Sequence, residues 1–156
     1  MDFNHQLITD FFEAFKNKDF EKMNKCYFEE VQYFDPMFHF LNGKYVMLMW
    51  KHKYEHAENF SLNWHSIEHL GSGYYTIKYE ITYVYINKKS IQLSVKSHIR
   101  IQNFLISEHS DAFSMHQFCR CAYGFIGDLL GWNRFYQNKK KLLIRSFFLN
   151  EVNEMN

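Results

Sequence analysis

The sequence has 156 residues, of which 47% are hydrophobic and 20% aromatic, and its net charge is +1. This length fits one domain, residues 1–156, large enough to bury roughly 70% of its unfolded surface, and the composition excludes a disordered chain. The near-zero net charge gives no electrostatic case for nucleic acid or an anionic membrane as a partner. Seventeen Phe and eleven Tyr exceed the need of a small core. We expect the surplus to line a cavity or fill an oligomer interface.

The cysteines and the N-terminus indicate the compartment. Cys26, Cys119 and Cys121 fit neither a disulfide framework nor a common zinc pattern, so we expect free thiols in a reducing cytosol. Residues 1–6 contain neither the basic nor the apolar region of a signal peptide. No apolar run approaches the roughly 18 residues of a membrane span. These features predict a soluble cytoplasmic protein with no membrane partner, and no pattern indicates a cofactor.

The first third of the chain is predicted to be mainly helical. Apolar residues at helical spacing predict a helix over 3–17, and Asp19 is a good N-cap for a second helix. A short strand over 31–34 leads to Asp35, and Pro36 stops that strand. Asn42 and Gly43 then open a third helix, whose apolar face carries Val46, Met49, Trp50, Tyr54 and Ala57.

Residues 60–113 alternate between apolar and polar with period two, which predicts half-buried antiparallel strands. One strand runs over 75–85, a turn follows at 87–89, the next strand runs over 91–101, and a last strand runs over 105–113. Only the three N-terminal helices offer a matching apolar face. The fold class is therefore predicted to be α+β, with a curved antiparallel sheet wrapped around the N-terminal helices.

This order of elements and several short segments resemble a known family. The segments are Phe34-Asp35-Pro36, then Leu41-x-Gly43-x-x-Val46-x-x-Met49-Trp50, then Glu108-His109-x-Asp111-x-Phe113, followed by the glycine-punctuated run over 120–132. Together they resemble the nuclear transport factor 2-like superfamily, which includes ketosteroid isomerases, SnoaL-like polyketide cyclases and limonene epoxide hydrolases. The last run is similar to a bacterial branch of ketosteroid-isomerase-like proteins. The resemblance covers most of residues 5–148 and implies a cone-shaped fold whose mouth holds a mostly apolar ligand.

The resemblance also implies roles for single residues. Asp35 matches the acid that shuttles a proton in the isomerases. Phe11 and Ser97 stand where the isomerases have the tyrosine and the protonated acid of their oxyanion hole. Losing one such donor costs about a hundredfold or more in rate, which argues against steroid isomerisation. Val95 and Ser97 stand where epoxide hydrolases have an Arg and an Asp, so that chemistry is also not expected.

The surroundings of Asp35 support a functional role independently. An almost uncharged stretch follows it, and an apolar environment disfavours a carboxylate that is neither paired nor solvated. Proteins tune acids for proton transfer in such settings. The alternative is a strand-end Asp that caps backbone amides beside Pro36. His109 and Asp111 are two apart on one strand and share a side, either as an acid–base pair facing the cavity or as a structural pair.

Residues 115–150 are predicted to be a helical extension of the same domain. Gly124, Gly127 and Gly131 punctuate an apolar run, which indicates a tight helical hairpin or a broken helix, and 135–149 form a closing helix. We expect this extension to pack across the mouth of the cone as a lid or against a second subunit as the arm of a homodimer.

Two classes of function follow. The first is an isomerase, cyclase or dehydratase acting on a hydrophobic carbonyl compound, with Asp35 as general acid/base, assisted by His109 and Asp111. The second is a non-catalytic module that binds a small hydrophobic molecule or docks a protein. In either case the predicted ligand-binding residues are Phe11, Phe15, Tyr33, Trp50, Tyr83 and Ser97.

No metal site is predicted. His52 and His56 are four apart on the third helix, a spacing that can chelate a metal. Lys51 and Lys53 flank His52, and no acidic third ligand is near in sequence. A solvated helix face therefore explains these histidines better.

Overall fold

The computed structural model describes residues 2–155. Within these residues the chain forms five helices and six strands. In chain order these are α1 (Phe3–Lys16), α2 (Phe20–Cys26), β1 (Tyr27–Asp35), β2 (His39–Asn42), α3 (Lys44–Tyr54), β3 (Glu58–Gly71), β4 (Tyr74–Val84), β5 (Ser90–Gln102), β6 (Leu105–Ala112), α4 (Met115–Leu130) and α5 (Arg134–Glu154).

Local chemistry sets the helix starts that the sequence predicts. The Asp2 side chain accepts a hydrogen bond from the backbone N–H of Asn4, and the Asp19 side chain accepts one from that of Lys22. Gly43 precedes α3 with a φ of +53°, a conformation that L side chains rarely adopt. The third helix therefore begins where the sequence places it.

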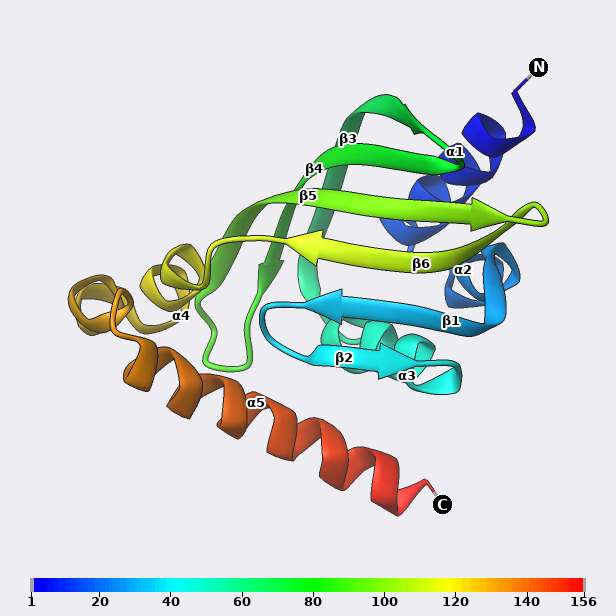
Figure 1. Cartoon of the computed structure of the whole chain (residues 1–156). Helices are drawn as coiled ribbons and strands as arrows, with labels where there is room; N and C mark the ends of the chain where they lie inside the picture. Colours follow the sequence, from blue (N-terminus) through cyan, green and yellow to red (C-terminus); the bar gives the residue numbers. More distant parts are fainter. Residues whose placement is uncertain (1, 156) are drawn as a thin grey trace.

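The strands form one curved sheet in the order β2-β1-β6-β5-β4-β3. Figure 1 shows the long, bent strands with α1, α2 and α3 behind the sheet, α4 at one end of the sheet, and α5 running from that end below β2 and α3. This arrangement confirms the predicted α+β class, with a curved sheet around the N-terminal helices and a C-terminal helical extension. The sheet is mixed, because β1 and β6 run parallel while the other neighbours are antiparallel.

The strand β2 is absent from the prediction. Pro36 ends β1 as expected, but the chain turns and comes back as β2, with Asp35 paired to His39 and Gln32 to Asn42. The segment is too short and irregular for a periodic signal, and His39 has a φ of +59°. α5 also extends to Glu154, five residues beyond the prediction.

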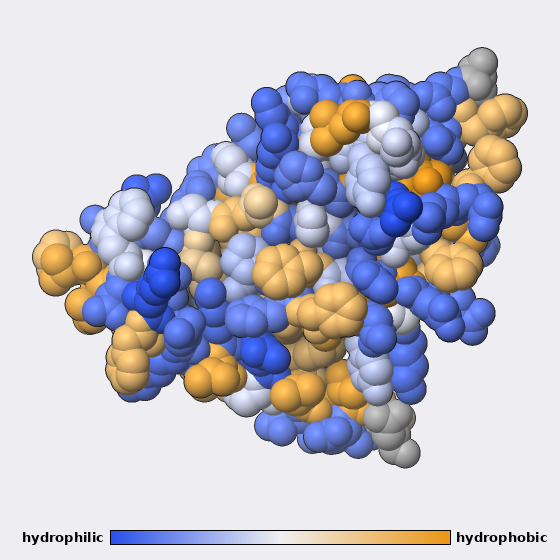
Figure 2. All heavy atoms as spheres, viewed as in Figure 1, coloured by the Kyte–Doolittle hydropathy of each residue, from blue (hydrophilic) through white to orange (hydrophobic). Residues whose placement is uncertain are grey.

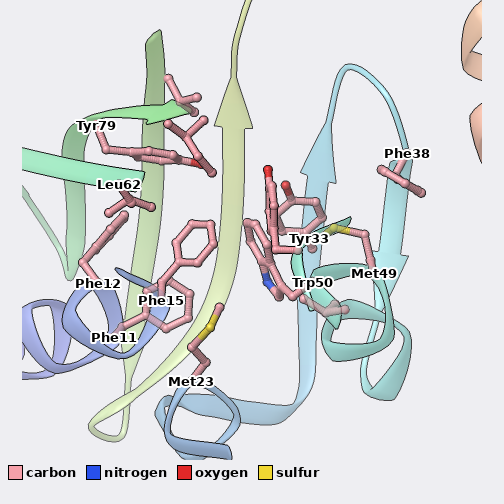
Figure 3. Packing of buried hydrophobic residues seen from close by; sticks show 14 of the residues in the cluster. Phe11, Phe12, Phe15, Met23, Tyr33, Phe38, Met49, Trp50, Leu62 and Tyr79 are labelled. Carbon is pink, nitrogen blue, oxygen red and sulfur yellow. The ribbon is translucent and has the colours of Figure 1, made fainter. Parts of the chain in front are cut away.

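Aromatic rings fill the interior between the helices and the sheet. Phe11, Phe12, Phe15, Tyr33 and Trp50 are at most 1% exposed. Figure 3 shows these rings converging from α1, α3 and β1. The Phe15 ring lies 4.8 Å from that of Trp50, centroid to centroid. The narrow part of the cone is therefore packed, and a cavity opens toward its rim.

In the described part of the chain, none of the helices has the length and apolar character needed to cross a bilayer. The three cysteines are free thiols, with Cys26 and Cys119 buried and Cys121 half-buried.

The packed interior leads to a stability prediction. Replacing Phe15, which is fully buried, by Ala should lower the free energy of unfolding by about 3–5 kcal/mol, because a ring-sized cavity remains. Phe3→Ala is the matched control, since Phe3 lies on the same helix and is 71% exposed. Its effect should stay within about 0.5 kcal/mol in urea titrations. Equal effects of the two substitutions would show that the interior is not tightly packed.

Candidate functional site

A cavity of about 740 Å³ opens at the mouth of the cone. Its walls come from the turn after β1, from α3, from the end of β4, and from α4 and α5. Small-molecule sites commonly have volumes of about 300–1,000 Å³ and mostly apolar walls. The apolar lining here includes Phe38, Tyr83, Phe118, Ile144 and Phe147.

Lys53 is one of the charged residues that line this cavity. Its ammonium Nζ lies 3.6 Å from Oδ2 of Asp35, and its side chain is 11% exposed. Four rings surround the ammonium, with centroids at 5.1–5.8 Å from Nζ: Phe38, Trp50, Tyr54 and Phe113. Cation–π attraction and the nearby carboxylate together hold the charge in this desolvated position.

Sequence reasoning missed Lys53, although a signal was present. Lys53 follows Trp50 by three positions and Met49 by four, so it lies within the apolar stripe of α3. A charged residue inside such a stripe must either extend out to water or find a partner. Here the partner is Asp35.

The buried Asp35 carboxylate is held from both sides. Its Oδ1 accepts hydrogen bonds from the backbone N–H groups of Met37 at 2.8 Å and Phe38 at 2.6 Å. Its Oδ2 accepts one from the Tyr33 hydroxyl at 3.0 Å and faces Lys53. Asp35 thus caps backbone amides through Oδ1, as the structural alternative predicts, while its Oδ2 faces the Tyr33 hydroxyl and the Lys53 ammonium. Asp35 itself does not line the cavity and reaches it through Lys53.

A buried polar network continues from Asp35 into the cone. The Tyr33 hydroxyl lies between two carboxylates, 3.0 Å from Asp35 and 3.4 Å from Asp111. Asp111 also accepts hydrogen bonds from Tyr79 at 2.7 Å and Ser97 at 2.6 Å. His109 lies beside it, with Nε2 at 3.1 Å from Oδ1. His109 and Asp111 therefore face the interior as a pair, on the side that the strand spacing predicts.

The other end of the network is the Tyr27 hydroxyl. It lies 2.7 Å from Nδ1 of His109 and accepts a hydrogen bond from the Trp50 indole at 3.1 Å. Every member from Trp50 to Asp35 is buried. Buried polar groups must be satisfied by partners, and this network meets that requirement for two carboxylates inside an aromatic interior.

The pKa values of these groups show which are charged. Burial by itself raises the pKa of Asp111, but the charge of His109 and hydrogen bonds from His109, Ser97 and Tyr79 outweigh it, so the pKa lies below its usual value. Burial raises the pKa of Tyr33 and Tyr79 well above the usual tyrosine value. Asp111 is therefore ionised at neutral pH, and the tyrosines are neutral donors.

Ser97, His109 and Asp111 do not form a nucleophilic triad. In a triad the serine and the acid contact different nitrogens of the histidine. Here Ser97 Oγ at 2.7 Å and Asp111 Oδ1 at 3.1 Å both contact Nε2. Ser97 is also fully buried, so a substrate cannot reach its hydroxyl.

The predicted ligand-binding residues divide into two groups. Tyr83 lines the mouth cavity. The others are buried in the packed interior and do not line it: Phe11, Phe15, Tyr33, Trp50 and Ser97. Tyr79 on β4 and Tyr27, the first residue of β1, also belong to the network through their hydroxyls, and the sequence did not predict this.

The histidine pair on α3 is divided between two environments. His52 is half-buried, pairs with Glu151 of α5 and packs edge-on against Phe148 at 5.5 Å. This position departs from the expected solvated face, because α5 covers that side of α3. The exposed His56 lies near Glu55. Within residues 2–155 no group of three or more His, Cys, Asp or Glu could hold a metal ion.

Comparison with known proteins identifies the fold. No family model and no curated protein matches the chain. An NTF2-like protein of unknown function from Burkholderia pseudomallei aligns with a TM-score of 0.68 and 16% identity over 79% of this chain and 99% of its own. An LEH-like epoxide hydrolase of M. tuberculosis aligns with a TM-score of 0.66 and 15% identity over 82% of this chain and 96% of its own. TerC, co-crystallised with polyporic acid, aligns with a TM-score of 0.67 and 12% identity over 77% of this chain and 98% of its own. The chain has the NTF2-like fold, as its sequence segments imply.

The lowered pKa of Asp111 predicts a pH-dependent stability. Its folded-state value lies below that of the unfolded chain, so ionised Asp111 stabilises the fold above about pH 4, and this contribution falls away as the pH drops through the folded-state pKa. Asp111→Asn should lower the free energy of unfolding at pH 7 by about 1–3 kcal/mol, since the buried donors Ser97 and Tyr79 lose a charged acceptor.

The difference between wild type and Asp111→Asn should narrow as the pH falls below about 4 in urea titrations. The exposed Asp10→Asn on α1 is the control and should show little change. A destabilisation by Asp111→Asn that is equal at every pH would contradict an ionised Asp111.

Proposed function

We propose that the protein binds a small, mostly apolar molecule in the mouth cavity, with an anionic or carbonyl oxygen placed against Lys53. The observation that carries this proposal is that the Lys53 ammonium lines the cavity without a close hydrogen bond to Asp35. Its Nζ lies 3.6 Å from Oδ2 of Asp35, which is beyond a good hydrogen bond. A ligand oxygen would satisfy it.

The composition of the cavity supports the same ligand class. Two charged pairs at the rim are already formed, Lys88 with Glu58 at 2.9 Å and His52 with Glu151. Apolar side chains from four elements provide the remaining walls. A ligand with an apolar body and one polar head therefore matches the site better than a highly charged one. TerC, with the same fold, was co-crystallised with polyporic acid, which supports small-molecule binding as a use of this architecture.

The test compares two probes of equal chain length, decanoate and decanol, by isothermal titration calorimetry. Wild type should bind decanoate at least tenfold more tightly, because the carboxylate meets a desolvated ammonium. Lys53→Met should abolish that preference and keep decanol binding. Lys51→Met is the matched control, since Lys51 lies on the same helix and is exposed. A preference for decanoate that survives Lys53→Met would reject the proposed role of Lys53.

A second candidate is catalysis of proton transfer on a hydrophobic carbonyl compound, and the Lys53–Asp35 pair favours it. A substrate carbonyl beside Lys53 would have its developing enolate stabilised by the ammonium. Asp35 would act as general acid/base on a substrate that reaches its Oδ2 beside Lys53, while Tyr33 and the Asp111–His109 pair hold the carboxylate in place. An isomerase, a cyclase or a dehydratase could use this arrangement.

Catalysis can be tested by deuterium exchange at the α-carbon of 2-tetralone in D₂O, followed by NMR. An active protein should accelerate the exchange, and Asp35→Asn and Lys53→Met should each reduce the acceleration at least tenfold. The control is Lys51→Met, which should retain it. If wild type gives no acceleration, or both site variants keep it, the enzymatic candidate is rejected and ligand binding alone remains.

That the protein forms a homodimer stays a prediction, and so does the role of residues 115–150 as a lid over the cavity or as a dimer arm. α5 provides a wall of the cavity through Ile144 and Phe147, as a lid would. The contact between His52 and Glu151 ties this wall to α3.

A further inference from the structure

The corner between α4 and α5 carries large apolar side chains that face solvent. We call these six residues the apolar tip, and their exposed fractions are 80% for Phe125, 60% for Ile126, 66% for Leu129, 41% for Leu130, 75% for Trp132 and 80% for Phe135. Figure 1 shows this corner projecting from the end of the sheet, and Figure 2 shows hydrophobic atoms gathered at that end of the molecule. A contiguous exposed apolar group of this kind marks an interaction surface.

Two glycines fix the outward direction of the tip. Gly124 has a φ of +61° and breaks the regular helix, so the turns after it take a new direction. Gly127 is buried, and a Cβ there would lie 1.9 Å from the carbonyl oxygen of Cys119. At 100° per residue, Phe125 and Leu129 lie nearly opposite Gly127 on this helix. The close packing of Gly127 therefore turns both apolar side chains away from the body.

Charge is distributed unevenly along the chain, which the total of +1 conceals. Residues 115–145 contain Arg120, Arg134, Lys139, Lys140, Lys141 and Arg145 but a single acid, Asp128, and so carry a charge of +5. Because the whole chain carries +1, the remaining residues carry −4. Lys139 is exposed between Phe135 and Leu142 on one face of α5. Lysines in this position keep their charge at a lipid headgroup while their stems lie along the apolar surface.

We propose that the apolar tip inserts into the interface of an anionic lipid membrane, with the exposed Arg134 and Lys139 facing the headgroups. Phe, Trp and Leu beside Lys and Arg are the composition of segments that lie in a membrane interface. A second copy of the chain docking tip to tip would bring the two positive regions together, which like-charge repulsion disfavours. The membrane association is peripheral and needs no spanning helix.

The experiment is co-sedimentation of the full chain with vesicles of phosphatidylcholine alone or of phosphatidylcholine and phosphatidylserine at 7:3. We expect binding to the anionic vesicles at least tenfold stronger than to the neutral ones, weakening as salt rises. Phe125→Ser/Leu129→Ser should reduce it at least tenfold, and Arg134→Glu/Lys139→Glu should do the same. The matched control is Leu70→Ser/Phe104→Ser, two residues that are 61% and 69% exposed at the opposite end of the strands.

Several results would overturn the proposal. These are absence of binding to anionic vesicles, equal binding to both lipid mixtures, and full binding by the tip variants with unchanged circular dichroism. Analytical ultracentrifugation is run on the same proteins. A dimer that forms in wild type and is lost in Phe125→Ser/Leu129→Ser, without vesicle binding, would assign the tip to a second copy. Binding to an acidic protein such as prothymosin α but not to vesicles would assign it to a protein partner.

Discussion

The site depends on how two carboxylates are kept inside an aromatic interior. Asp35 and Asp111 are buried and share the Tyr33 hydroxyl, which lies within 3.4 Å of both. Each carboxylate has one cationic or basic neighbour, Lys53 for the first and His109 for the second. Removing water from an unpaired carboxylate costs roughly several kcal/mol. Neither Asp35 nor Asp111 could therefore occupy this interior without its neighbour, Lys53 or His109. The network therefore explains why polar side chains appear on the inner faces of β1, β5 and β6.

This pairing also sets what the cavity can do. Asp35 uses Oδ1 for two backbone amides and Oδ2 for Tyr33 and Lys53, so Lys53 rather than Asp35 lines the cavity. The rings around Lys53 leave only 11% of its side chain exposed. A fixed, weakly solvated positive charge facing an apolar cavity is a selective contact for one oxygen of a ligand and a poor contact for water.

The fold and the inner faces could be predicted from the sequence because they rest on periodicity. Alternation over β4 and β5 placed Ser97 on the inner side, and the structure pairs Ser97 with Asp111 on the neighbouring strand. Two-residue spacing likewise placed His109 and Asp111 together. The rest of the site depends on curvature and packing. How far the sheet closes decides whether the cone is hollow, and period-two patterns carry no measure of that closure. The short β2 and the covering of His52 by α5 also depend on how distant segments pack, so local patterns in the sequence do not predict them.

α5 connects the two surfaces of the molecule. Its second half provides Phe147 and Glu151 to the cavity and the α3 contact, whereas its first residues belong to the apolar tip. The moderate burial of this helix, with Ile144, Phe148 and Val152 as its buried residues, means that few apolar contacts hold it to the body. Elements held by few buried contacts are the ones that open at low free energy. The proposed ligand cavity and the apolar tip therefore share one helix, which is held to the body by few buried side chains.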